Sequence, residues 1–241
     1  MPRKKKKNRP MKRPMNRPVK GRLPQQAIER EGDLDLVVRE LLEYFSCPYP
    51  FHQVRAGFMG NVASPDLQVM PLREVERTWN GALPEFRSAA EMNSFMQIMV
   101  MGFYNKMSSH QDRDNPFKLV KLEPIFLSDV CVMLFGRARH EEIDGFVGGL
   151  FCGQKNIALP TIARETIESL LEKRESFAAA AEMANDPSEQ ADEASIERTL
   201  EKFQEMTRAA EEEINVVIQS CKAARAKAVD MLFMDRPQMI R

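Results

Sequence analysis

The chain has 241 residues, enough for one sizeable domain with appendages, and its 35 basic and 35 acidic residues give a formal net charge of zero. No stretch approaches the roughly 20 apolar residues of a membrane-spanning helix, and the N-terminus lacks the apolar run of a secretory signal. We therefore expect a cytoplasmic protein with no membrane segment. Four widely spaced cysteines without a CxxC pair argue against a disulfide framework or a zinc knuckle.

Residues 1–26 are predicted to form a disordered, basic, proline-rich tail. Residues 1–22 contain eleven basic residues and no acidic residue, so removing them leaves 24 basic against 35 acidic residues in the remainder. Proline at every fourth position of a short Arg-Pro repeat prevents a helix and keeps the backbone extended. The predicted nucleic-acid-binding residues are Arg3, Lys4, Lys5, Lys6, Lys7, Arg9, Lys12, Arg13, Arg17, Lys20 and Arg22.

Residues 34–184 are predicted to form a helical domain, because apolar residues recur at three- and four-residue steps and few alternating strand patterns compete. A methionine stripe in the segment 88–108 is interpreted as pliable core rather than as a binding groove. The predicted fold class is all-α. The predicted helices are 34–46, 54–64, 72–80, 88–108, 124–135, 140–152 and 161–184.

Residues 185–194 are predicted to be an acidic hinge, followed by a long coiled-coil-like helix over 195–234. Apolar and small residues there alternate in steps of four and three, which is the pattern of a heptad seam. We expect an antiparallel arrangement, either a fold-back on the 161–184 helix or a homodimer through 195–234. The seam positions are Ile196, Leu200, Phe203, Thr207, Ala210, Ile214, Val217, Cys221, Ala224, Ala228 and Met231.

Two similar glycine motifs, 88 positions apart, are predicted to pack helices closely. Glycines three residues apart on one helix let a second backbone approach, while the residues between them fill the core. The predicted helix-packing residues are Gly57, Phe58, Gly60, Gly145, Phe146 and Gly148.

These motifs resemble the YecA/YgfB family of small bacterial proteins over about residues 34–175. The resemblance rests on Gly57-Phe58-Met59-Gly60 with Ser64-Pro65, Met70-Pro71-Leu72 leading to Trp79, Gly102-Phe103-Tyr104-Asn105-Lys106, and Asp144-Gly145-Phe146-Val147-Gly148-Gly149-Leu150. It implies an all-helical fold, no established catalytic activity, and an adaptor or regulator. The cysteine-rich zinc segment of some relatives is absent here, and neither the basic tail nor the long helix belongs to the family pattern.

No catalytic signature is recognisable, so we expect a protein that is not an enzyme, without metal or cofactor. The three histidines, His52, His110 and His140, lie outside known catalytic motifs. The glycine-rich segment 148–156 lacks the Gly-Lys-Ser/Thr ending of a phosphate loop. An enzyme with an unrecognised site near the loop 108–116 is the minority hypothesis.

The tail predicts a nucleic-acid-associated accessory or regulatory protein. Closely spaced cations displace counterions from a phosphate backbone of DNA, RNA or the ribosome, while the helical body binds a protein partner. The absence of aromatic residues from 1 to 43 argues against base stacking. The alternative is a purely protein-binding adaptor, in which the tail acts in solubility, self-neutralisation or targeting.

Overall fold

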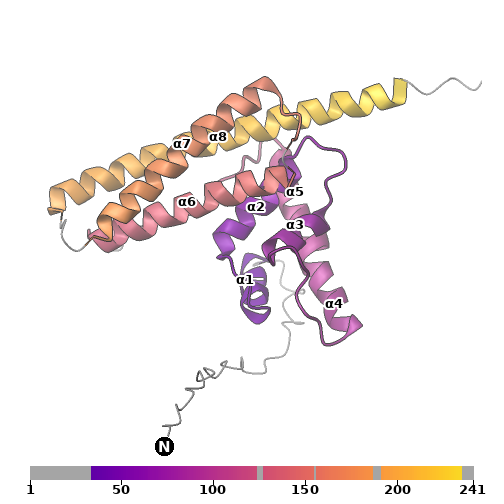
Figure 1. Ribbon diagram of the computed structural model, residues 1–241, viewed down its shortest axis with the longest axis horizontal. Coiled ribbons are helices and arrows are strands. Elements are labelled where there is room, and N and C mark those ends of the chain that lie inside the picture. Colours follow the sequence, from indigo (N-terminus) through magenta and orange to yellow (C-terminus); the bar gives the residue numbers. More distant parts are fainter. Residues whose placement is uncertain (1–33, 124–126, 155, 187–190, 235–241) are drawn as a thin grey trace, which may run out of the picture.

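The computed structural model describes residues 34–123, 127–154, 156–186 and 191–234. These residues form helices and no strand, which confirms the predicted all-α fold class (Figure 1). The helices are α1 (Leu34–Tyr44), α2 (Phe51–Ala63), α3 (Pro71–Thr78), α4 (Ala89–Met96), the π-helix η1 (Gln97–Tyr104), α5 (Asn105–Ser108), the short 3-10 helix η2 (Ser109–Gln111), α6 (Asp129–Phe151), α7 (Thr161–Ala184) and α8 (Glu193–Met234).

The three longest helices, α6, α7 and α8, pack as successive hairpins (Figure 1). The middle helix α7 contacts both α6 and α8, and Phe177 of α7 stacks edge-on against Phe203 of α8. With 42 residues, α8 is about 63 Å long and extends past the end of α7. The seam positions from Ile196 to Cys221 are buried in the same hydrophobic core as the rest of the body.

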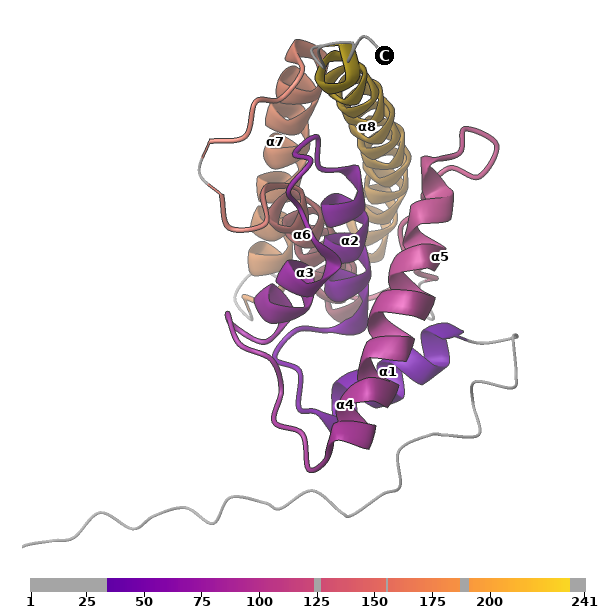
Figure 2. The same cartoon turned by 90° about the vertical axis from the view of Figure 1, so that its right-hand side faces the viewer.

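The remaining helices gather around α2, which lies along α6 (Figure 2). Every residue of α2 except His52 and Arg55 is buried, which a helix achieves only when neighbours surround it. Phe58 of α2 packs against Phe103 of η1, and Phe95 of α4 packs against Trp79. The N-terminal helices and the long hairpins therefore share one core, in which α2 and α6 are the central pair.

Two of the predicted helix boundaries are wrong. The segments 124–135 and 140–152 were predicted as separate helices, but α6 is continuous from Asp129 to Phe151. Gly136 lies in the middle of α6 without interrupting the helix. A side chain there would press against the carbonyl oxygen of Phe177 in α7, so this glycine allows α6 and α7 to pack closely. The predicted helix 88–108 is divided, since its middle turns form the π-helix η1.

The predicted hinge and tail are described only in part. The polypeptide reverses direction between α7 and α8, and Asp192 begins α8 by accepting a hydrogen bond from the backbone N–H of Ser195 at 2.8 Å. Residues 187–190 of the predicted hinge and the whole predicted tail, 1–26, lie outside the described residues. None of the described helices is long and apolar enough to cross a membrane.

Candidate interaction surfaces

The two glycine motifs meet where α2 crosses α6. A Cβ atom on Gly60 would overlap with the carbonyl oxygen of Phe146, and one on Gly145 would overlap with that of Gln53. The predicted packing residues Phe58 and Phe146 are completely buried beside them. This contact holds the two central helices close enough for backbone to touch backbone.

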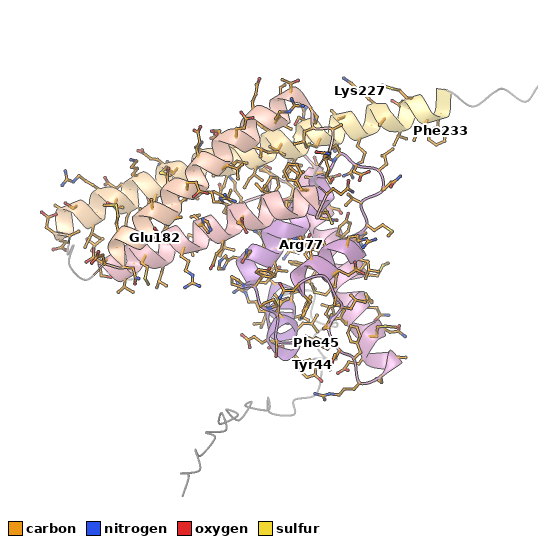
Figure 3. All side chains as sticks on the ribbon, in the orientation of Figure 1. Tyr44, Phe45, Arg77, Glu182, Lys227 and Phe233 are labelled. Atoms are coloured by element: carbon orange, nitrogen blue, oxygen red, sulfur yellow. The ribbon has the colours of Figure 1, made fainter. Side chains whose placement is uncertain are left out.

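The other two predicted glycines face a buried ion pair rather than a helix backbone. A Cβ atom on Gly57 or on Gly148 would meet the guanidinium of Arg77, which forms two hydrogen bonds with the Glu74 carboxylate at 2.6 and 2.8 Å. Figure 3 shows Arg77 at the junction of α3 with α2 and α6. Burial raises the pKa of Glu74, while the adjacent guanidinium opposes that shift.

Gly149, which is not among the predicted packing residues, also lies directly against the backbone of α2. A Cβ atom there would overlap with the carbonyl oxygen of Gly57, so Gly149 and not Gly148 is the glycine that contacts α2 directly. The signal was present, because Gly149 lies four residues after Gly145 and therefore on the same helix face. Spacing within one helix, rather than likeness between the two motifs, identifies it.

A second buried pair fastens an extended segment, residues 117–120, to α6 and α8. Arg139 is paired with Glu142 in the core, and both also bind backbone groups of Val120: Glu142 accepts from its N–H at 2.8 Å and Arg139 donates to its carbonyl at 2.7 Å. Asn215 bonds both the N–H and the carbonyl of Phe117 at 2.9 Å. Because these side chains replace a β-ladder, the segment is held in place without any strand partner.

The three histidines lie apart and each has a structural contact. His52 bonds Glu141 at 2.7 Å across the α2–α6 junction, whereas His110 and His140 contact the carbonyl oxygens of Asn115 and Arg174. Among the described residues, no three His, Cys, Asp or Glu side chains are grouped as a metal site requires. The hydrogen-bond partners of the three histidines within the described residues are thus one carboxylate and two backbone carbonyls.

Two apolar grooves are open on the surface of the body. The larger, about 540 Å³, lies between the start of α3 and the helix α4–η1, and it is lined by Met70, Pro71, Leu72, Asn93, Met96, Gln97, Val100 and Met101. The stripe interpreted as core consists of Met92, Phe95, Met96, Met99, Phe103 and Met107, and most of it is buried: Met99 and Met107 are inaccessible, whereas Met92 is 38% exposed. Met101, which lies outside the stripe, is 66% exposed. The second groove, about 490 Å³, lies among α6, α7 and the first half of α8.

Four charged side chains of α8 bind other parts of the same chain. Glu213 binds Lys173 of α7, and Glu211 binds Lys118 of the extended segment. Lys222 donates to the carbonyl of Gln111, and Arg225 donates to carbonyls at the end of α2. Since the buried part of the seam contacts α6 and α7 of the same chain, a homodimer through 195–234 needs another face of the helix.

The predicted nucleic-acid-binding residues, Arg3 to Arg22, all lie outside the described residues. No protein-family model matches this chain, no curated protein is similar to it, and no solved structure resembles it. The resemblance to the YecA/YgfB family therefore stays an expectation from its motifs.

Proposed function

We propose that this protein is a non-enzymatic, nucleic-acid-associated accessory protein whose basic N-terminal segment binds the phosphate backbone and whose helical body binds a protein partner. The observation that carries the proposal is charge segregation: residues 1–22 contain eleven Lys or Arg and no Asp or Glu. Such a density of cations releases counterions from a nucleic acid and gives sequence-tolerant affinity.

The surface of the body supports this division of labour. Beyond residue 22 acidic residues outnumber basic ones by 35 to 24, so the body as a whole repels a polyanion. The exposed residues of α8 include Glu193, Glu197, Glu201 and Glu205, a row at four-residue spacing. Phosphate contact is therefore expected from residues 1–22, and the body is left to make other contacts.

The test is a salt series of fluorescence-anisotropy titrations with a labelled DNA duplex and an RNA duplex of equal length. If residues 1–22 neutralise about six to ten phosphates, affinity should fall roughly 10³- to 10⁵-fold between 50 and 200 mM salt. Replacing Arg9, Arg13 and Arg17 with glutamine should reduce the slope of log affinity against log salt by about three, because each phosphate contact contributes about 0.9. Charge-neutral substitutions at Met11, Met15 and Val19 are the matched control and should leave the slope unchanged.

Deletion of residues 1–22 decides between this proposal and its alternative. If the shortened chain binds both duplexes as tightly as the full chain at every salt concentration, the phosphate-binding role is refuted.

The alternative, a purely protein-binding adaptor, is favoured by the groove beside η1. Met96 and Met101 line it, and methionine-rich apolar surfaces adapt to varied partners. π-Helical segments also occur frequently at functional sites. A nuclease-treated pull-down separates the two functions: the adaptor predicts that a partner is retained equally by the full chain and by residues 23–241, and that Met101→Glu releases it.

A further inference from the structure

One face of α8 stays exposed along most of its length after the seam is buried. At about 100° per residue, nine residues between Lys202 and Asp230 lie within about 40° of the direction of Val216. All nine are exposed or half-buried, and Val216 itself is 43% exposed. We call this the outer stripe; it consists of Lys202, Glu205, Ala209, Glu212, Val216, Ser220, Ala223, Lys227 and Asp230.

We propose that the outer stripe binds the outer stripe of a second copy of this chain, as an antiparallel pair with its two-fold axis at Val216. In that register a residue before Val216 faces the residue equally far after it in the second copy. Ala209 then faces Ala223, Glu205 faces Lys227, and Val216 faces itself. Every contact occurs twice, as a two-fold interface requires.

Charge complementarity selects both the second copy and the antiparallel direction. Glu205 faces Lys227 of the second copy, and Lys202 faces Asp230 of the second copy, so the pair contains four opposite-charge contacts. A parallel pair would set each of these charges against its own kind, which is destabilising. Within the described part of the chain none of these four side chains has an ion-pair partner, so the charges are available for such contacts.

The middle of the stripe suits close approach of two helices. Around Val216 the stripe carries Ala209, Ser220 and Ala223, whose short side chains let the helix axes come within the lower part of the usual 8–10 Å range. Glu212 faces Ser220 of the second copy and remains at the edge, in contact with water. The stripe is thus apolar near Val216 and charged toward both ends, and coiled-coil pairs likewise combine an apolar seam with charged residues that set the partner and the direction.

The same register also covers two exposed apolar features that the monomer leaves open. The end of α8 that carries Lys227 and Phe233 extends beyond the body (Figure 3), and Met231 there is 63% exposed. In the proposed register Met231 lies beside Lys202 of the second copy, which lines the groove among α6, α7 and α8 together with Thr199, Phe203 and Met206. Each projecting end therefore lies beside the groove of the other copy, which removes exposed apolar surface twice.

Analytical ultracentrifugation of the full chain over a range of concentrations tests the pair. The unmodified chain should show a concentration-dependent monomer–dimer equilibrium, and Val216→Glu should shift it strongly to monomer by placing two carboxylates together on the axis. Because Val216 is exposed, the variant should keep the circular dichroism spectrum of the unmodified chain, and the two should have the same thermal transition at concentrations at which both are monomeric. A full chain that is monomeric at every concentration would overturn the proposal.

Charge reversal tests the register independently. Glu205→Lys turns two attractive contacts into repulsive ones and should weaken dimerisation roughly ten- to thirtyfold. The double variant Glu205→Lys/Lys227→Glu restores opposite charges and should recover the dimer. Glu197→Lys, an identical change on the same helix but about 100° away from the stripe, should have no effect. Failure of the double variant to recover the dimer, or equal weakening by Glu197→Lys, would rule out this register.

Discussion

The contact between Gly149 and the backbone of Gly57 predicts that adding a single methyl group will destabilise the fold. In an unconstrained helix, Gly→Ala stabilises by up to about 1 kcal/mol. At Gly149 the new Cβ atom overlaps with the Gly57 carbonyl oxygen, so α2 and α6 must separate. A separation of about 0.5–1 Å forfeits a quarter to a half of the dispersion energy of the facing atoms, which here include the buried Phe58 and Phe146.

We expect Gly149→Ala to lower the free energy of unfolding by about 3 kcal/mol, the upper part of the usual range for overpacking. For a chain of this size that corresponds to a fall in Tm of roughly 6–12 °C. Urea titration and thermal unfolding, both followed by circular dichroism, measure it. The matched control is Gly102→Ala, whose methyl group has ordinary contacts of 3.4 Å with the Gln97 carbonyl and 3.5 Å with Leu34. If Gly149→Ala is as stable as the unmodified chain, the two helices are not in backbone contact and the packing argument fails.

Three further predictions concern buried polar groups. Arg139→Met leaves Glu142 buried without its cation and should lower the free energy of unfolding, measured by urea titration, by about 3–5 kcal/mol. Arg137→Met is the control: it removes a 71% exposed partner of Glu141 and should lower the free energy of unfolding by less than about 1 kcal/mol. Burial raises the pKa of Glu74, so the folded state keeps a proton on this carboxyl group at a pH at which the unfolded chain has released it. The free energy of unfolding of the unmodified chain, compared with that of Glu74→Gln, should therefore fall as pH rises from the ordinary carboxyl pKa to the raised one. A difference that does not depend on pH would contradict this. Burial also raises the pKa of Cys221 to about 11, so little of the reactive thiolate forms in the folded chain. Mass spectrometry should therefore find iodoacetamide bound to Cys221 only after unfolding. Equal labelling of the folded chain would show that the thiol is accessible.

Periodicity was sufficient to predict α7 and α8, but not the continuity of α6. The heptad steps of 195–234 identified which side of α8 is buried, from Ile196 to Cys221, because an apolar face must be covered whatever covers it. The pattern could not show whether α7 or another chain provides the cover. That choice depends on the reversal between α7 and α8 and on contacts such as the one between Lys173 and Glu213, which lie 40 residues apart.

The interior polar contacts were beyond local reasoning for the same physical reason. Asn215 and Phe117 are 98 positions apart, so nothing near either residue indicates that one will satisfy the backbone of the other. Glu142 lies near the start of the predicted helix 140–152, where an acid is usually exposed, yet its carboxylate is buried between Arg139 and the backbone of Val120. The glycines were predictable as packing residues, but the carbonyl that each one approaches is set by the angle at which α2 crosses α6.

The order of the long helices along the chain affects how the protein folds during synthesis. Leu200, Phe203 and Ile214 are supplied by α8, which leaves the ribosome after α6 and α7, and Arg225 donates to the carbonyl of Val62, 163 residues earlier. Domains generally fold as units as they emerge, so Phe135 of α6 and Phe177 of α7 stay uncovered until α8 is released. During that interval a nascent chain presents an apolar surface that chaperones bind, and truncation within α8 would make that state permanent.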